Sequence, residues 1–201
     1  DVRSRVQELH ERLGLRFPVY VMVTKTDLLA GFMEFFGDMS REERAQVWGM
    51  TFDLNAPGTA VNYAGQFGAD FEGLERRLHA RVLKRLQDER DLQRRCAIYS
   101  FPQQFSALRP LLSEFMEKAF GGSRFGEQPL VRGVYFTSGT QEGSPIDRVL
   151  GTLSRTFNLE RKILPPSASS GKSFFINRLL HDVIFTEAGL VGGNEKKERQ
   201  R

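Results

Sequence analysis

A short, unbroken apolar run near the N-terminus constrains the fold more than any other feature of this sequence. Residues 17–23 read Phe-Pro-Val-Tyr-Val-Met-Val and include three β-branched valines. A run of this length and composition predicts a strand that is buried on both faces, which is typical of parallel sheets in α/β proteins. The run ends in the polar turn Thr24-Lys25-Thr26-Asp27, at the strand's carboxyl end, where open α/β sheets place their ligands.

The other apolar patterns predict helices and strands that alternate along the chain. Apolar residues recur at helical spacing in four segments, namely residues 1–13, 71–91, 105–120 and 145–157. Apolar runs predict two more strands, at residues 96–100 and 130–137. This alternation indicates an α/β fold with a parallel sheet flanked by helices.

Two changes of composition divide the chain. Residues 28–70 are rich in phenylalanine and glycine, and their one helix signal is a capping box that begins at Ser40, so we interpret them as a helical and aromatic insertion packed on the sheet. After Pro166 a small polar linker leads into a short amphipathic helix and a charged end. These changes predict a truncated α/β domain over residues 1–158 and a C-terminal helical extension over residues 159–201.

The turn at residues 24–27 matches the polar–Lys–x–Asp pattern. In GTPase-type nucleotide-binding domains, a turn with this pattern recognises the base of the nucleotide. In that role the stem of Lys25 lies along the purine ring, and the Asp27 carboxylate accepts hydrogen bonds from N1 and N2 of guanine. Such charge-assisted bonds contribute roughly 1.5–3 kcal/mol each, which distinguishes guanine from adenine. Thr24 offers a hydroxyl where asparagine is usual. The alternative is that Asp27 only caps the following turn.

A second small turn, Thr137-Ser138-Gly139, follows the last predicted strand. GTPases place a short loop near the base at this point, and small residues allow that loop to approach a ligand closely. Serine and glycine are also the usual residues of an ordinary strand-to-helix turn, and this alternative stays open.

The tripeptide Gly171-Lys172-Ser173 resembles the end of a phosphate-binding P-loop, G-x-x-x-x-G-K-[ST]. The first glycine of that pattern falls at Pro166, and proline has a fixed φ and no N–H to offer a phosphate. A solvated helix start is therefore the simpler interpretation. The alternative is a circularly permuted GTPase that uses residues 171–173 as its P-loop.

The chain of 201 residues carries a net charge of +4, and the excess lies in two segments. Residues 75–95 hold eight basic and four acidic residues, and residues 195–201 hold four basic and two acidic ones. The first segment has no interleaved aromatic residues, so it predicts a solvent-facing helix rather than a nucleic-acid groove, and we expect no nucleic-acid partner. Arg77, Arg81 and Arg85 are candidates for docking an acidic protein.

The sequence shows no further pattern of catalytic or metal-binding residues. His10, His79 and His181 have no metal-ligand spacing, and no Ser/His/Asp set is evident, so we predict neither a catalytic residue nor a metal site. The one cysteine, Cys96, falls inside a predicted apolar strand, where a buried thiol is inert. No apolar run approaches the roughly 20 residues that a membrane-spanning helix needs.

Four segments of the sequence carry a resemblance to a known family. In order, they are PVYVMVTKTDLLAGF from Pro18, SREERAQVWG from Ser40, VYFTSGTQEGSP from Val134, and SFFINRLLHDVIFTEAG from Ser173. With these segments the sequence resembles the IcmF/TssM family of bacterial type VI secretion systems. Family members carry a cytoplasmic GTPase-like domain between membrane-spanning helices. The resemblance therefore implies a partial GTPase-like (P-loop NTPase-like) sheet, whose P-loop and magnesium-binding elements precede the Pro18 strand.

The resemblance also implies a role and partners. It implies a structural domain on the cytoplasmic face of the bacterial inner membrane, in contact with TssL and TssJ of the membrane complex and with TssK and TssG of the baseplate. Thr24, Lys25 and Asp27, and more weakly residues 137–139, would then be the base-binding residues. This stretch alone would hold no cofactor, whereas the full-length protein could bind GTP or ATP with Mg²⁺.

The basic end of the chain has two interpretations. If a spanning helix follows, the cations lie on its cytoplasmic flank, as the positive-inside rule expects, where they would also attract anionic lipid head groups. The alternative is a frayed, solvated terminus. The cations are Lys196, Lys197, Arg199 and Arg201.

Overall fold

The computed structural model describes residues 2–13, 15–54, 61–121, 128–139, 172–190 and 192–193. The helices are α1 (Val2–Leu13), α2 (Phe32–Phe36), α3 (Arg41–Ala45), α4 (Tyr63–Asp88), α5 (Leu92–Ser106) and α6 (Arg109–Phe120). The strands are β1 (Leu15–Arg16), β2 (Pro18–Val23), β3 (Gly49–Thr51), β4 (Leu130–Phe136) and β5 (Gly192–Gly193). Short helical turns form η1 (Thr26–Leu28), the π-helical η2 (Leu179–Ile184) and the 3₁₀-helical η3 (Thr186–Leu190).

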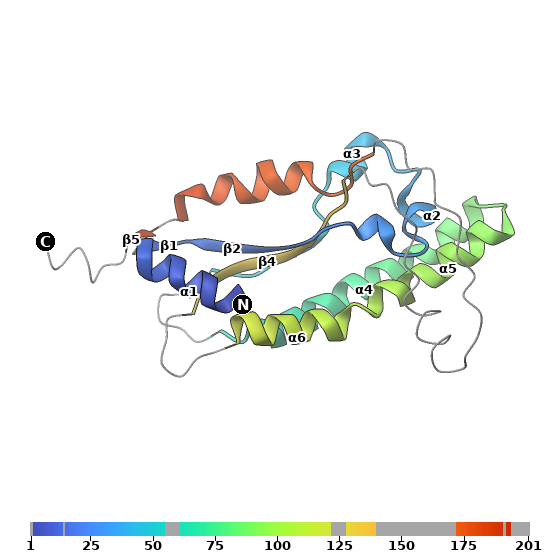
Figure 1. The fold of residues 1–201 in the computed structure, drawn as a ribbon. Coiled ribbons are helices and arrows are strands. Elements are labelled where there is room, and N and C mark those ends of the chain that lie inside the picture. The colour runs from blue at the N-terminus through green and yellow to red at the C-terminus, as the bar shows by residue number, and fades with distance from the viewer. Residues whose placement is uncertain are drawn as a thin grey trace, which may run out of the picture.

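The main sheet has the strand order β2-β4-β3, with β2 parallel to β4 and β3 antiparallel to β4. The predicted strands at residues 17–23 and 130–137 and their parallel pairing are therefore confirmed. The expectation of a purely parallel sheet is wrong, because β3, a short strand inside the aromatic insertion, joins the sheet in the opposite direction. A second, two-stranded ladder pairs β1 with β5, so the segment just before β2 lies beside the last described residues (Figure 1).

The predicted strand at residues 96–100 is also wrong, because these residues lie within α5. The Asp91 carboxylate begins this helix by accepting a hydrogen bond of 2.8 Å from the Arg94 N–H, and Ile98, Phe101 and Phe105 form its buried face. A run this short fits about one turn of helix as well as a strand, and of residues 96–100 Ile98 alone is buried. Cys96 consequently lies on the exposed side of a helix rather than in a buried strand.

Other local predictions hold with shifted bounds. The first helix is confirmed as α1, and the capping box is present at α3, where Ser40 and Glu43 exchange hydrogen bonds of 3.2 and 2.8 Å. Helix α4 begins eight residues before the predicted start, because Asn62 caps it and Phe67 extends its buried face. The predicted helix at residues 145–157 and the linker before Gly171 lie outside the described residues.

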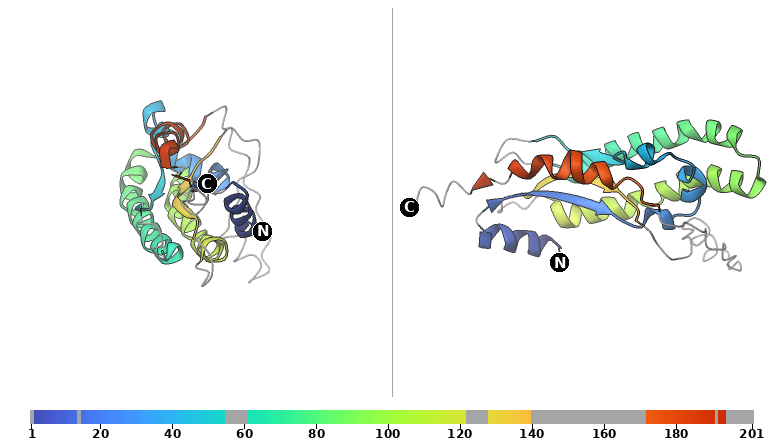
Figure 2. Two further views of the ribbon diagram at one scale, coloured as in Figure 1. Left: turned by 90° about the vertical axis from the view of Figure 1, so that its left-hand side faces the viewer. Right: turned by 90° about the horizontal axis from the view of Figure 1, so that it is seen from above.

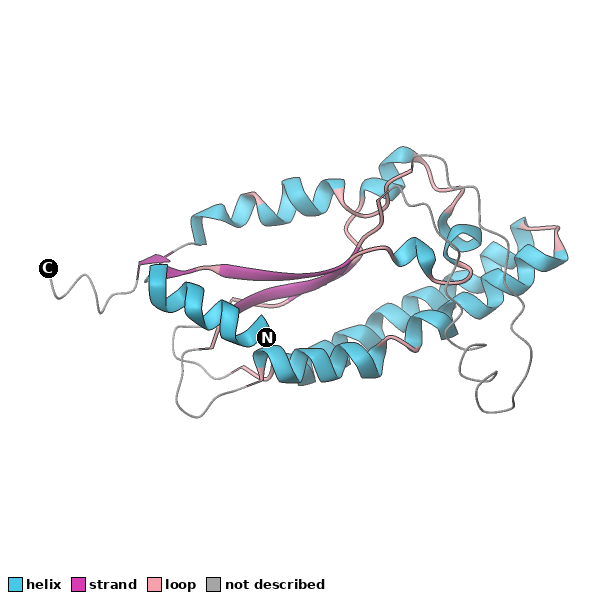
Figure 3. Cartoon of the chain, viewed as in Figure 1, coloured by secondary structure: helices cyan, strands magenta, loops and turns pink. Residues whose placement is uncertain are grey.

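The core is built from aromatic side chains between the sheet and the helices. Phe32, Phe36, Trp48 and Phe101 form a cluster of rings with centroids 5.0–6.5 Å apart, as the aromatic insertion predicts. Helices α4 and α6 lie on one side of the sheet, and the C-terminal segment of residues 179–190 lies on the other (Figures 1 and 2). Figure 3 shows the strands as a narrow layer between these helices.

Candidate functional site

The two turns that the sequence marks as base-side loops lie next to each other, at the carboxyl ends of β2 and β4. Thr26 is buried and donates to the Thr137 carbonyl twice, from its N–H at 3.2 Å and from Oγ1 at 3.0 Å. The Thr137 N–H in turn donates to the Val23 carbonyl at 2.9 Å. Lys25 adopts the left-handed conformation, with φ 59°, which turns the chain sharply after β2.

Asp27 is buried in this turn without a partner for one of its oxygens. Asp27 is 8% exposed. Its Oδ1 atom is the one buried side-chain oxygen among the described residues that has no hydrogen-bond partner. No capping hydrogen bond from Asp27 exists in the described part of the chain, which weighs against the capping alternative. Leaving such an acceptor unpaired costs roughly 1–3 kcal/mol. The Asp27 carboxylate would therefore be stabilised by a hydrogen bond from a donor outside the described residues.

The neighbouring loop ends in a glycine with open space beside it among the described residues. A β-carbon added at Gly139 would meet no heavy atom of the described residues within 4 Å. The backbone of Ser138 is fixed by two hydrogen bonds to Phe174. The Ser138 N–H donates to the Phe174 carbonyl at 3.0 Å, and the Phe174 N–H donates to the Ser138 carbonyl at 2.8 Å. Thr24 and Lys25 have exposed side chains on the other flank. The turn therefore offers one buried acceptor, one cation and a small open loop.

The C-terminal segment is held to the opposite end of the sheet by a network that the sequence did not predict. The buried Arg132 side chain binds Glu187 through Nε–Oε2 at 2.9 Å and Nη2–Oε1 at 2.7 Å, and also donates to the Phe52 carbonyl. The Tyr20 hydroxyl donates to Glu187 Oε2 at 2.6 Å. The pairing register of β2 and β4 passes over Arg132, which marks it as the extra residue of a bulge.

These contacts shift the ionisation of all three groups. The hydrogen bonds from Arg132 hold the pKa of Glu187 below its usual value, and the same contacts raise the pKa of Arg132. Burial, followed by the Glu187 hydrogen bond, raises the pKa of Tyr20. The signal that could have revealed this network is a lone arginine inside the otherwise apolar strand at residues 130–136.

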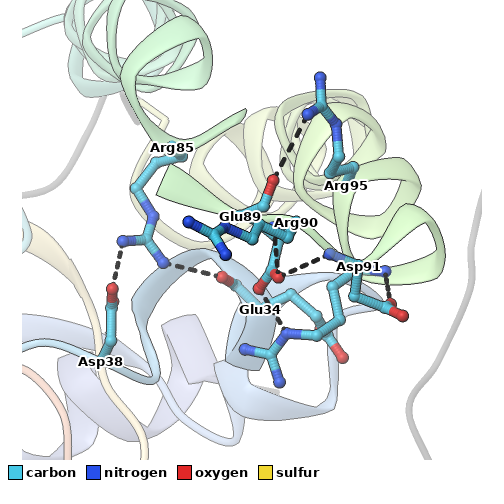
Figure 4. Close-up of polar contacts among 8 residues, drawn as sticks. Glu34, Asp38, Arg85, Glu89, Arg90, Asp91 and Arg95 are labelled. Carbon is cyan, nitrogen blue, oxygen red and sulfur yellow. Dashed lines mark hydrogen bonds and ion pairs between the residues drawn. The ribbon is translucent and has the colours of Figure 1, made fainter. Parts of the chain in front are cut away.

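The predicted docking arginines of α4 have different environments. Arg77 and Arg81 are exposed, whereas the Arg85 guanidinium pairs with Asp38 and donates to the Glu34 carbonyl at 3.0 Å (Figure 4). Arg85 therefore holds α4 against the segment around α2 and is not free to bind a partner in this arrangement. The remaining docking prediction rests on Arg77 and Arg81.

The turn between α4 and α5 accounts for more of the local charge. Figure 4 shows the Glu89 carboxylate accepting from the N–H groups of Arg90 and Asp91 at 2.8 and 3.0 Å, and Arg94 Nε donates to it at 2.6 Å. Part of the basic excess of residues 75–95 is thus used to fix this turn.

The remaining predicted site residues are only partly described. Lys172 Nζ donates to the Gly37 carbonyl at 3.1 Å, and Ser173 is exposed. Gly171 and the basic tail, Lys196, Lys197, Arg199 and Arg201, lie outside the described residues. Within the described ranges, no cluster of His, Cys, Asp and Glu side chains suits a metal ion, and no helix has the length and apolarity to cross a membrane.

Comparison with known proteins identifies the family to which this chain belongs. The IcmF-related N-terminal domain family matches residues 1–201, so the chain belongs to this family and the predicted IcmF/TssM resemblance is confirmed. The chain is 54% identical over 200 residues to the type VI secretion system component TssM1 of Pseudomonas aeruginosa. That match covers all of this chain and 18% of TssM1. No solved structure matches the chain.

Proposed function

We propose that this domain is a docking scaffold of the type VI secretion membrane complex and carries the base-reading half of a nucleotide site. The observation that carries the nucleotide part is the buried, unpartnered Oδ1 of Asp27. Type VI secretion is the system to which the relative TssM1 belongs by name.

The chemistry of the turn favours a guanine base. A carboxylate that lacks a donor pairs with a base edge that presents two adjacent N–H donors, and guanine presents N1 and N2 in this way. Adenine presents an unprotonated N1 at the corresponding place, so its edge opposes an acceptor with an acceptor. Lys25, exposed beside Asp27, supplies the alkyl stem that lies along the purine. GTP or GDP with Mg²⁺ is therefore the expected ligand of the full-length protein, and ATP is the weaker candidate.

The phosphate half of the site has to come from elsewhere in the protein. The described residues of this chain contain no glycine-rich phosphate loop, and Lys172 is engaged with the Gly37 carbonyl. We infer that the P-loop and the Mg²⁺ ligands belong to a segment that precedes Pro18 in the full-length protein. The 201-residue chain alone then binds nucleotide weakly and catalyses no hydrolysis.

The scaffold part of the proposal rests on charge placement. Arg77 and Arg81 are exposed and lie four residues apart on α4, on one face of that helix, and Arg81 also interacts electrostatically with Glu43 of α3. Exposed cations on a rigid helix suit an acidic protein surface. We propose that this surface meets TssK or TssG of the baseplate, that TssL and TssJ are bound within the membrane complex, and that the domain lies on the cytoplasmic face of the inner membrane.

The experiment is a titration of the full-length protein with a fluorescent GDP analogue in the presence of Mg²⁺. GDP and GTP should displace the analogue at concentrations at least about tenfold lower than ADP and ATP, because two charge-assisted hydrogen bonds are at stake. Asp27→Ala should remove this preference, whereas Asp88→Ala, an exposed aspartate at the end of α4, should leave it intact. Equal displacement by adenine nucleotides would overturn the base site.

A further inference from the structure

The end of the α4–α5 hairpin carries the most exposed apolar side chains of the described chain. Leu83 of α4 and Leu92 and Tyr99 of α5 are 74%, 71% and 62% exposed, which is more than any other large apolar residue among the described ones. The hairpin projects beyond the strands, away from the end of the sheet where β1 pairs with β5 (Figures 1 and 2). Single exposed apolar residues are ordinary, but a group of them at one projecting end marks a contact surface.

Helix α5 is apolar on two faces. Its buried face packs into the aromatic core. Leu92, Cys96 and Tyr99 recur at spacings of four and three residues, so they share one side of the helix, and all three are exposed. A helix that is apolar on more than one face is normally covered on each of them. We call the exposed side, with the exposed Arg95 included, the outer face of α5.

The hairpin turn holds the outer face of α5 in a fixed orientation. Asp91 caps α5 through the Arg94 N–H, and the Glu89 carboxylate accepts from two backbone N–H groups and from Arg94 Nε (Figure 4). Arg85 fixes the α4 side of the turn to Asp38. A surface that is already ordered loses little conformational entropy on binding. These contacts therefore favour a preformed docking surface.

Charge indicates the chemistry of the partner. Residues 83–99 contain five basic and three acidic residues. Two of the basic residues, Arg85 and Arg94, form ion pairs within the domain. The other three, Lys84, Arg90 and Arg95, are exposed, and Arg95 lies within the apolar stripe. Apolar side chains bordered by cations fit an amphipathic helix whose own apolar side chains are bordered by carboxylates.

The same charges disfavour two other occupants. In a two-fold pair of identical copies packed through this face, the two Arg95 side chains, midway between Leu92 and Tyr99, would approach each other near the symmetry axis. An anionic membrane that met the end of the hairpin would approach the exposed carboxylates of Asp88 and Asp91. A partner helix can place its carboxylates beside Arg95 and avoids both repulsions.

We propose that the outer face of α5 binds an amphipathic helix with apolar and carboxylate side chains, supplied by a baseplate protein. Leu92 and Tyr99 insert between the apolar side chains of that helix, Cys96 lies beneath it, and Arg95 pairs with its carboxylates. This inference rests on the proposed docking function and adds a second surface, which is largely apolar, to the charged face of α4.

The Cys96 thiol reports whether this face is covered. The test measures the rate at which N-ethylmaleimide alkylates Cys96 in the full-length protein, followed by mass spectrometry of its peptide, with and without purified TssK and TssG. The proposal predicts that complex formation slows the alkylation at least about tenfold, because an exposed thiol becomes buried. An unchanged rate in a complex that still forms would overturn this inference and leave the docking function intact. A full-length protein that binds neither TssK nor TssG would overturn both.

Two further outcomes identify other occupants. Slow alkylation that requires only a higher concentration of the protein itself would mean a second copy, and slow alkylation caused by phosphatidylglycerol vesicles alone would mean a membrane. Either result contradicts a helix from a baseplate protein.

Substitutions on the same face provide a second measurement. Leu92→Ser combined with Tyr99→Ser should weaken co-purification with TssK and TssG at least about tenfold, because two apolar anchors are lost. Both residues are exposed, so the thermal unfolding temperature should stay unchanged. The matched control is Leu111→Ser, at a residue of α6 that is 52% exposed, and it should leave binding intact. Equal binding by the native protein, the double variant and the control would overturn the proposal.

Discussion

Arg132 and Glu187 form a bidentate ion pair that joins the central strand β4 to the C-terminal segment, 55 residues apart in the sequence. Just before that segment in the chain, Phe174 and Phe175 are buried, and Phe174 pairs with Ser138. Residues 174–190 are thus fixed to the sheet at both ends, once beside the candidate base site and once through Glu187 on Arg132.

Glu187→Gln should lower the free energy of unfolding of the 201-residue chain by roughly 2 kcal/mol, because it leaves the buried Arg132 guanidinium without its counter-charge. Urea unfolding followed by circular dichroism measures this loss. Glu117→Gln, at an exposed position on α6, is the matched control and should change stability by less than about 0.5 kcal/mol. Equal effects of the two substitutions would show that the ion pair does not stabilise the fold.

The stabilisation by Glu187 should depend on pH. Its pKa is lower in the folded protein than in the unfolded chain, so the carboxylate stabilises the fold above the ordinary glutamate pKa of about 4.3 and loses this effect as the pH falls through the folded value. The difference in unfolding free energy between the native protein and Glu187→Gln should therefore be constant near neutrality and shrink below about pH 4. A difference that stays the same from pH 7 to pH 3 would contradict the assignment.

Reversing the charges of Arg77 and Arg81 to glutamate should weaken co-purification of the full-length protein with TssK and TssG several-fold, because both cations are exposed on one face of α4. The control is the same reversal at Arg12 and Arg41, which are exposed on α1 and α3. Arg85→Glu should instead destabilise the domain, because this side chain pairs with Asp38. Unchanged binding by the Arg77 and Arg81 variant, with the fold intact, would remove this face of α4 as a docking surface.

Lys172→Ala separates the two interpretations of the Gly171-Lys172-Ser173 tripeptide. Since Lys172 Nζ donates to the Gly37 carbonyl, the substitution should leave the affinity of the full-length protein for GTP unchanged within about twofold and cost at most about 1 kcal/mol of stability. Isothermal titration with GTP and Mg²⁺ measures the affinity. A large loss of affinity in a folded variant would support the circularly permuted GTPase.

Local patterns predicted much of what surrounds the candidate site. Strand β2 is a continuous apolar run and β4 is apolar apart from Arg132 and Gly133. Because the two strands pair in parallel, the turns after them lie at the same edge of the sheet, so the neighbourhood of Thr26 and Thr137 could be expected from the sequence. The run Cys96–Ser100 fits a strand as well as a helix because four apolar residues and a serine are too few to show a period, and only the Asp91 cap and the later Phe105 distinguish a helix.

Long-range relationships could not be read from the sequence in the same way. The pairing of Arg132 with Glu187 depends on a bulge that turns one residue of β4 toward the C-terminal segment. Arg85 resembles the neighbouring exposed arginines in sequence, and its contact with Asp38 depends on how α4 packs against the insertion. The membership of β3 in the sheet likewise requires the fold of that insertion.

The base-reading turn is tested most directly by exchanging the hydrogen-bonding character of Asp27. An asparagine there presents an N–H donor, which suits the C2 carbonyl of xanthine and opposes the donors of guanine. Equilibrium titration of the full-length Asp27→Asn protein should show at least about tenfold weaker binding of GDP and stronger binding of xanthosine diphosphate than the native protein shows. Unchanged affinities for both nucleotides would contradict a role for Asp27 in reading the base.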